Sequence, residues 1–277
     1  METAVVRVSV APVLAARTVT SEQVTQALLG APVQVLARSP RWARIRMQDD
    51  YEGWISTAHL GPDPRSALEW VTVTDLWAHL RPRPEYRMPA RRVAFIGTRL
   101  PLREREPGWL GVALPADGVG WLEAHRGRVH PPGDEPPPPA PEALLATARR
   151  FLGVPYLWGG CSPLGLDCSG FVQLVYRLHD VRLPRDAGPQ SRAGEPVPPE
   201  AVGSAPSALL AAGDAVFFRS AEEPARIGPL GLALREWRFI HAAGGDGVRV
   251  NDLDDPPYGE RLVCARRYLR NSAPTGG

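Results

Sequence analysis

The first 129 residues consist of short runs in which apolar and polar positions alternate, the pattern of half-buried antiparallel strands. One set of runs is VVRVSVA, PVQVLARS, WARIRM and GWISTAHL; a second is WVTVTDLWAHLRP, RRVAFIGTRLPLRE, GWLGVALP and GVGWLEA. Turn-rich breaks separate the runs. The Gly-Trp pair that closes the first set, at positions 53 and 54, recurs about 67 residues later in the second. The pattern predicts two copies of one small β-barrel, over residues 1–62 and 66–129.

A Pro-rich stretch, HPPGDEPPPPAPE, separates these runs from the rest of the chain. Proline disfavours helix and removes hydrogen-bond donors that a sheet needs. We therefore predict an extended linker over residues 130–140, followed by a third domain over residues 141–272.

Beyond the linker the apolar spacing becomes helical. PEALLATARRFLG, residues 141–153, has an apolar stripe at positions 144, 145, 148, 151 and 152. A Gly-rich loop then leads to CSGFVQLVYRLHDV, whose apolar positions predict a helix that begins at Cys168. The runs GDAVFFR, LGLALREW, RFIHAAGG, GVRVNDL and CARRYL read as strands of an antiparallel sheet. A cysteine-bearing helix packed on such a sheet predicts an α+β domain.

Composition narrows the function classes. The 277 residues carry a net charge of +2, which argues against a dedicated binder of nucleic acid or of an anionic membrane. No stretch approaches the roughly 20 consecutive apolar residues of a membrane span, and the first residues do not read as a signal peptide. We expect a cytoplasmic protein with reduced thiols. The three cysteines lack zinc-ligand spacing, and nothing in the chain implies a metal, a nucleotide or another cofactor.

Cys168 is the candidate nucleophile. A thiolate is the reactive form of cysteine, and a helix N-terminus lowers the pKa of a thiol through its partial positive charge. Backbone N–H groups at the same place stabilise an oxyanion formed by attack on a carbonyl. Cys264 lies in an apolar strand and reads as a structural thiol. Cys161 is too far from Cys168 for a CxxC redox pair and is interpreted as incidental.

The segment YLWGGCSPLGLDCSGFVQLVYRLHDVRLPRDAGPQ, with GDAVFF and RFIHAAGG after it, closely resembles the catalytic domain of the NlpC/P60 papain-like cysteine peptidases. The N-terminal runs resemble bacterial SH3 domains. The whole chain is similar to the subgroup that cleaves murein peptides between γ-D-glutamate and a diamino acid. This resemblance implies a papain-like α+β domain preceded by two SH3-like β-barrels. It also implies amide hydrolysis through an acyl-enzyme on Cys168, with a base His and a second polar residue that orients it.

The base His is where this chain departs from the family. Members carry it in a strand reading roughly H-V-G-I-Y, shortly before a strand reading F-I-H-A-S. Setting residues 239–242 on F-I-H-A places Gly231 on the glycine of the first strand without a gap, and the base position then falls on Pro229. His241 matches the orienting residue. A proline side chain accepts no proton, so the thiol pKa is expected nearer the roughly 8.5 of a free cysteine than the roughly 3 to 4 of a His-paired one.

The resemblance also implies where a substrate lies. The free amino end of a short peptide is held against the first SH3-like module, for which Glu22 and Tyr51 are the matching candidates. Near the nucleophile, the positions that match the family's cleft are Tyr156, Trp158, Asp167 and Ser169. Trp158 has an alternative role as a packing anchor for its loop. His179 lies about three helical turns beyond Cys168, which places it far from the thiol.

Three functions remain open from the sequence. The favoured one is a protein that binds short murein peptides such as L-Ala-γ-D-Glu-diamino acid and has weak or no peptidase activity. The second is an active γ-D-glutamyl-L-diamino acid endopeptidase that uses a rearranged site of Cys168 and His241. The third is a scaffold whose SH3-like modules bind a protein partner. A nucleic-acid or membrane partner is not expected.

Overall fold

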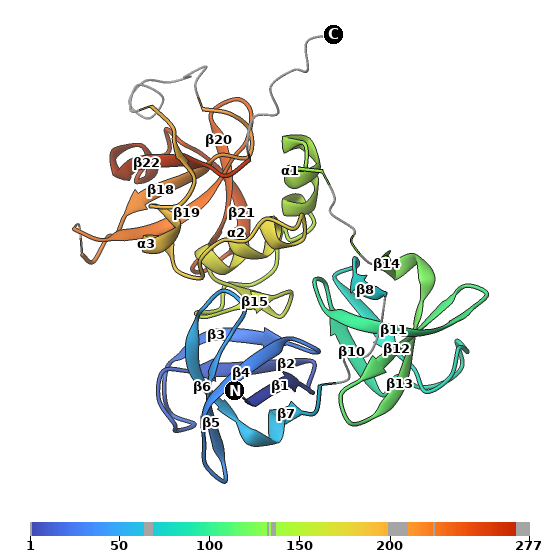
Figure 1. The fold of residues 1–277 in the computed structure, drawn as a ribbon. Helices are drawn as coiled ribbons and strands as arrows, with labels where there is room; N and C mark the ends of the chain where they lie inside the picture. The colour runs from blue at the N-terminus through green and yellow to red at the C-terminus, as the bar shows by residue number, and fades with distance from the viewer. Residues whose placement is uncertain are drawn as a thin grey trace. The chain divides into compact units, whose positions relative to one another are not determined.

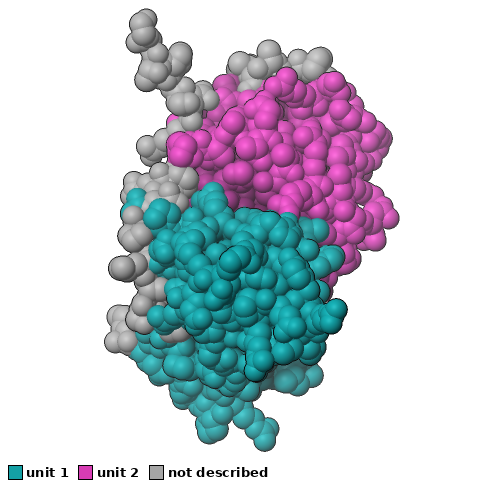
Figure 2. Space-filling view, turned by 90° about the vertical axis from the view of Figure 1, so that its right-hand side faces the viewer, with its two compact units in different colours: residues 1–135, 161–163 teal, residues 136–160, 164–277 magenta. Residues whose placement is uncertain are grey.

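The computed structural model describes residues 2–63, 69–131, 133, 137–198, 210–223 and 225–269. The chain divides into two compact units, residues 1–135 with 161–163 and residues 136–160 with 164–277 (Figure 2). In the part of the chain that the structure describes, no helix has both the length and the hydropathy needed to cross a membrane.

Unit 1 begins with a seven-stranded antiparallel sheet in the order β3-β2-β6-β5-β4-β1-β7 (Figure 1). Its strands are β1 (Glu2–Val6), β2 (Val10–Leu14), β3 (Gln23–Leu28), β4 (Pro32–Arg38), β5 (Trp42–Arg46), β6 (Glu52–Ser56) and β7 (Leu60–Gly61). The run VVRVSVA, predicted as one strand, is divided between β1 and β2, and β3 was not predicted. Alternate positions of β2, β5 and β6 supply the fully buried core residues Ala11, Val13, Ala43, Ile45 and Ile55.

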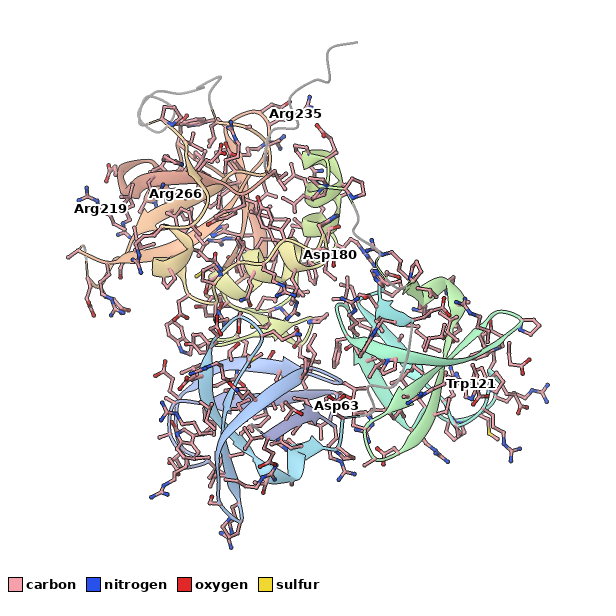
Figure 3. All side chains as sticks on the ribbon, viewed as in Figure 1. Asp63, Trp121, Asp180, Arg219, Arg235 and Arg266 are labelled. Atoms are coloured by element: carbon pink, nitrogen blue, oxygen red, sulfur yellow. The ribbon has the colours of Figure 1, made fainter. Side chains whose placement is uncertain are left out.

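A second set of strands follows in unit 1. These are β8 (Trp70–Val73), β9 (Trp77–Leu80), β10 (Arg92–Phe95), β11 (Arg99–Glu106), β12 (Trp109–Leu114), β13 (Gly118–Glu123) and β14 (Gly127–His130). Five of them form a sheet in the order β13-β12-β11-β8-β14, and β9 and β10 form a hairpin. Trp121 of the second Gly-Trp pair, labelled in Figure 3, lies on β13 and is buried.

The two sets end in the same succession of elements. In the first, β6 leads through the 3₁₀ turn η1 (Thr57–His59) to β7; in the second, β13 leads through η2 (Ala124–Arg126) to β14. Both Gly-Trp glycines stand where strands approach closely. A Cβ on Gly53 would lie 2.5 Å from Val13, and one on Gly120 would lie 2.8 Å from Leu114. These recurring features are the physical basis of the Gly-Trp repeat in the sequence.

Unit 2 contains a six-stranded antiparallel sheet in the order β17-β22-β18-β19-β20-β21. Its strands are β17 (Glu195–Pro196), β18 (Ala215–Arg219), β19 (Ile227–Ala233), β20 (Arg238–Ala243), β21 (Gly247–Asp252) and β22 (Leu262–Arg267). The helices are α1 (Pro141–Arg149), α2 (Cys168–Arg177), α3 (Ala187–Gln190) and α4 (Tyr258–Arg261). α2 lies against β19 and β20. The short strands β15 (Cys161–Ser162) and β16 (Gly165–Leu166) form a hairpin just before α2.

The predicted α+β class, a papain-like domain preceded by SH3-like barrels, is confirmed. Helices begin at Pro141 and at Cys168, as the apolar spacing predicted. β19 ends at Ala233, earlier than the run LGLALREW, because Glu236 and Trp237 adopt positive φ angles in the turn to β20. The domain boundaries stay predictions, since residues 64–68, part of the linker and residues 270–272 lie outside the described residues.

Candidate active site

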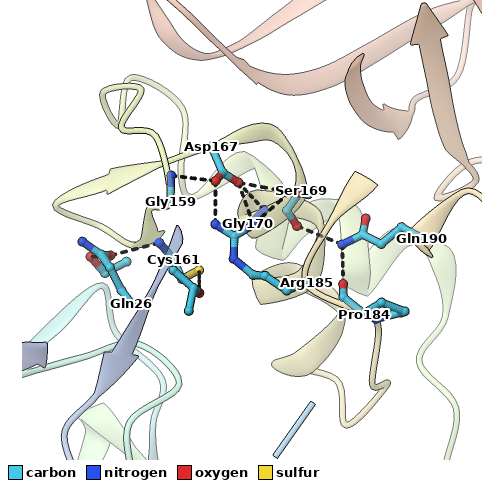
Figure 4. Close-up of polar contacts among 11 residues, drawn as sticks. Gln26, Gly159, Cys161, Asp167, Ser169, Gly170, Pro184, Arg185 and Gln190 are labelled. Carbon is cyan, nitrogen blue, oxygen red and sulfur yellow. Dashed lines mark hydrogen bonds and ion pairs between the residues drawn. The ribbon is translucent and has the colours of Figure 1, made fainter. Parts of the chain in front are cut away.

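The first turn of α2 is organised by the carboxylate of Asp167, the N-cap residue. Its Oδ1 accepts the backbone N–H of Gly170 at 2.6 Å, and its Oδ2 accepts the backbone N–H of Gly159 at 2.9 Å. The Ser169 hydroxyl donates to Oδ1 at 3.3 Å (Figure 4). A side-chain oxygen that caps a helix in this way satisfies N–H groups that have no partner within the helix. Asp167 therefore sets where α2 begins, and with it the position of Cys168.

Arg185 completes this network, and the sequence analysis missed it. Its guanidinium group binds the Asp167 carboxylate with both arms, at 3.1 Å and 2.5 Å, and also donates to the Ser169 hydroxyl at 2.8 Å. The Arg185 residue is 2% exposed. The signal that could have identified it is LPRDA-x-x-Q, in which this arginine follows a leucine-proline pair.

The side chains of Asp167 and Ser169 thus form hydrogen bonds within the protein. Both residues are buried, and their polar atoms are bonded to one another, to Arg185 and to the backbone. Their predicted contact with a substrate stays a prediction, and what the contacts establish is a structural role at the start of α2.

Cys168 is the first residue of α2 and is half-buried. Burial, and after it the charge of the adjacent Asp167 carboxylate, raise the pKa of its thiol to about 12. The backbone N–H of Leu230 and the Arg185 guanidinium act in the opposite direction by favouring the thiolate. The expected helix-end effect is therefore outweighed by desolvation, and the thiol is protonated at neutral pH.

Tyr156 is another residue predicted to line the cleft, and its contact with a substrate stays a prediction. Its pKa is raised first by burial and then by the nearby charges of Cys168 and Asp167, which places its hydroxyl within their electrostatic reach. A backbone bridge between Tyr156 and Leu166 ties this residue to the hairpin before α2. Trp158 is 61% exposed, so a role as a buried packing anchor does not fit it. Its exposed ring stays a predicted substrate contact.

Pro229 lies in β19, immediately before the residue whose N–H approaches the thiol. Phe217 of β18 pairs with Leu230, whereas Arg219 pairs with Ile227, so two residue steps in β18 oppose three in β19. The extra residue makes a β-bulge at positions 228 and 229. Proline within a sheet is confined to edges and bulges because it cannot donate to the ladder. The strand therefore accommodates Pro229, which is exposed.

β19 and β20 are antiparallel neighbours in the sheet. Leu232 pairs with Ile240, which puts Gly231 beside His241. A Cβ on Gly231 would lie 2.8 Å from the Cβ of His241 and 2.7 Å from the Ile240 carbonyl oxygen. This close approach leaves no room for a side chain at position 231. Pro229 lies two residues earlier on the same strand.

His241 is fixed in place by a hydrogen bond and by two aromatic neighbours. It is 1% exposed, and its Nε2 lies 3.1 Å from Oδ1 of Asn251 on β21. The rings of Phe239 and Tyr258 pack against it with centroid separations of 4.5 Å and 5.3 Å. Nδ1 is buried and has no hydrogen-bond partner among the described residues. A buried polar atom without a partner is costly, so Nδ1 destabilises this buried arrangement of the ring.

Burial lowers the pKa of His241 from 6.5 to about 4, even though its hydrogen bond to Asn251 favours the protonated form. Between these two pH values the unfolded chain binds a proton that the folded chain does not. The stability contributed by neutral His241 is therefore complete above about pH 6.5 and is lost as the pH falls toward 4.

We expect this loss to amount to about 2 to 3 kcal/mol between pH 7 and pH 4.5. Urea unfolding of the wild type and of His241→Gln at both pH values measures it, because the variant keeps every other titrating group. The fall in unfolding free energy should be smaller in the variant by that amount. Equal falls in the two proteins would show that His241 is protonated in the folded state at pH 4.5.

Glu22 and Tyr51, the candidates for binding an amino group, lie in the first barrel of unit 1. Glu22 precedes β3, and its backbone oxygen accepts the N–H of Ala15 at 2.9 Å, just beyond the end of β2. β2 in turn pairs with β6, through Leu14 and Trp54, and Tyr51 precedes β6. The topology therefore brings both residues to the same end of neighbouring strands. Glu22 is exposed and Tyr51 half-buried.

The other two thiols and His179 have structural surroundings. Cys161 is buried in unit 1, where its N–H donates to Oε1 of Gln26 at 3.0 Å and its sulfur lies 3.3 Å from the Thr25 hydroxyl (Figure 4). Cys161 is therefore held by polar contacts within unit 1 rather than incidental. The thiol pKa of Cys264, on β22, is raised by burial. His179 contacts the Thr147 hydroxyl at 2.9 Å and so joins α2 to α1.

Known proteins share both parts of this architecture. The NlpC/P60 family model matches residues 153–267, and a model described as the bacterial dipeptidyl-peptidase Sh3 domain matches residues 16–60. The γ-D-glutamyl-L-lysine dipeptidyl-peptidase of Bacillus cereus is 32% identical over 258 residues, which cover 88% of this chain and 75% of the relative. The protein of the same name from Bacillus subtilis is 28% identical, over 88% of this chain and 80% of its own length.

Among solved structures, an NlpC/P60 family protein from Bacillus cereus superposes with a TM-score of 0.85 at 27% identity. The superposition covers 97% of this chain and 100% of that one. Sequence and structure agree on the assignment. The chain belongs to the NlpC/P60 family and carries bacterial SH3-like modules in front of its papain-like domain.

Proposed function

We propose that this protein binds short murein peptides of the type L-Ala-γ-D-Glu-diamino acid and hydrolyses their γ-D-glutamyl bond weakly or not at all. The substrate class is supported by the relatives, which are named as γ-D-glutamyl-L-lysine dipeptidyl-peptidases. The similarity to them extends over both the SH3-like region and the papain-like domain, so it includes the parts in which Glu22, Tyr51 and Cys168 lie.

The weak activity is supported by one observation above all, which is Pro229 on β19. It adjoins the residue whose N–H approaches the thiol, and it stands two positions from the glycine that contacts His241. A nucleophilic cysteine needs a group that takes its proton and later gives it to the leaving amine. Proline does neither, because its side chain has no atom that accepts or donates a proton.

A rearranged site with His241 as the base is the weaker candidate. Its Nε2 is engaged with Asn251, its ring is enclosed by aromatic neighbours, and its pKa of about 4 makes it a poor proton acceptor at neutral pH. Using it would require β20 to shift so that the imidazole leaves its pocket.

The proposal is tested by calorimetry with L-Ala-γ-D-Glu-L-Lys, together with chromatography for cleavage products. We expect the wild type to bind the peptide with little or no cleavage. Glu22→Gln should bind it about 10- to 100-fold more weakly, since a charge-assisted hydrogen bond to the peptide ammonium contributes roughly 1.5 to 3 kcal/mol. Glu2→Gln is the matched control, because Glu2 is an exposed carboxylate of the same barrel whose ion pair is with Arg38.

Each outcome separates the candidates. Rapid cleavage by the wild type would show an active endopeptidase and overturn the proposed weak activity. Equal affinity for Glu22→Gln and wild type would remove Glu22 from the site. If the protein neither binds nor cleaves the peptide, the remaining candidate is the scaffold function, in which the SH3-like modules bind a protein partner.

A further inference from the structure

A buried carboxylate adjoins the nucleophile in this site. Asp167 immediately precedes Cys168, and its negative charge opposes ionisation of the thiol. The charge is also held in place, because Asp167 caps α2 through Gly170 and accepts the N–H of Gly159. A carboxylate so close to a cysteine would suppress its reactivity unless a positive group offsets it.

Arg185 is the cation that meets this carboxylate. Its two guanidinium arms bind the two Asp167 oxygens, and one arm also reaches Ser169. The paired, planar geometry is specific to arginine, since a lysine presents a single point charge. Both side chains are buried, so solvent screens the pair little.

The segment that carries Arg185 is fastened to α2 at several points. The side-chain amide of Gln173 donates to the Leu183 carbonyl at 3.0 Å. The side-chain amide of Gln190, fully buried, donates to the carbonyls of Ser169 at 3.1 Å and Pro184 at 2.8 Å (Figure 4). These contacts fix the backbone on both sides of the arginine. The guanidinium is therefore preorganised against the helix start rather than drawn in from solvent.

We propose that Arg185 is a positioning residue for Cys168: it holds the Asp167 cap in place and offsets the charge of that carboxylate beside the thiol. The inference rests on the proposed role of Cys168 as nucleophile and is independent of peptide hydrolysis. Among the described residues, the other groups that act on the thiol are the neutral Tyr156 hydroxyl and the backbone N–H groups of Ser169 and Leu230.

The test is the rate of iodoacetamide alkylation of Cys168 at pH 9, measured by mass spectrometry in four variants. Arg185→Met should slow labelling about tenfold or more, because the thiolate fraction of Cys168 falls tenfold for each unit by which the pKa of its thiol rises. Asp167→Asn should accelerate it. The double variant should return to within about threefold of the wild type, since the carboxylate and its counterion are removed together. The labelling rate of Arg185→Lys should lie between those of the wild type and Arg185→Met.

A purely structural role of Arg185 would give a different pattern of labelling rates. If Arg185 only stabilises the fold, Arg185→Met should speed labelling through loosening, and the double variant should not recover. Labelling of Cys161 and Cys264 in the same spectra serves as the control, because loosening exposes these thiols too. Equal Cys168 rates in Arg185→Met and wild type, with both control thiols unchanged, would overturn the proposal. None of these readouts uses the peptide, so they are separate from the binding test.

Discussion

Replacing Pro229 by histidine is expected to raise γ-D-glutamyl peptidase activity by about a hundredfold or more, the order of magnitude that a positioned general base contributes. The imidazole would stand on β19, one residue before Leu230, whose N–H approaches the thiol. It would take the Cys168 proton as sulfur attacks the γ-carbonyl carbon. It would then give that proton to the diamino acid's amine as the C–N bond breaks. Water, activated by the same imidazole, would release the peptide from sulfur.

The measurement is the rate of product formation from L-Ala-γ-D-Glu-L-Lys, followed by chromatography. Pro229→Ala is the matched control, because it removes the proline ring and restores the backbone N–H without adding a base. A gain in Pro229→His that is absent from Pro229→Ala assigns the effect to the imidazole. No gain in a folded Pro229→His protein, with peptide affinity retained, would mean that position 229 does not face the thiol.

The second large effect concerns Cys168 in the wild type. With its pKa raised to about 12, chiefly by burial, the thiol should be alkylated on the order of a thousandfold more slowly at pH 7 than a free cysteine. The sign follows from the ionisation: a raised pKa leaves less thiolate at every pH below it. The rate of iodoacetamide labelling should therefore rise about tenfold for each pH unit between pH 7 and pH 10, with no plateau.

Mass spectrometry distinguishes labelling of Cys168 from that of Cys161 and Cys264. Pro229→His is the informative comparison, since an imidazolium beside the sulfur stabilises the thiolate and should bring rapid labelling at mildly acidic pH. Rapid labelling of the wild type at that pH would contradict the prediction and would identify another group as the proton acceptor.

Much of the fold follows from local patterns in the sequence. Alternation of apolar and polar residues predicted most of the strands, and the apolar stripes beginning at Pro141 and Cys168 predicted the two main helices. The recurring Gly-Trp pair predicted the repeat, since each glycine stands where a Cβ would collide with a neighbouring strand. Such signals are readable because they reflect each residue's nearest neighbours and the period of its own strand or helix.

The features that the sequence did not predict have a common physical origin. VVRVSVA is divided into two strands, and β3 and β14 were not predicted, because pairing with distant strands decides where a short strand begins and ends. The bulge at Pro229 was not predicted, since a bulge is defined by the partner strand. Arg185 was missed because its partner lies 18 residues earlier in the chain.

The sequence alone established which residue types are available: a cysteine at a helix start, an aspartate before it, and a proline at the position that the resemblance assigns to the base histidine. Tertiary structure decided their properties. The helix end favours a thiolate, but desolvation and the Asp167 charge outweigh it, so the thiol pKa lies far above its ordinary value. Likewise His241 is a histidine in sequence and a neutral, buried hydrogen-bonding group in the fold. Ionisation depends on how many atoms exclude water and which charges lie nearby, and segments distant in the chain supply both.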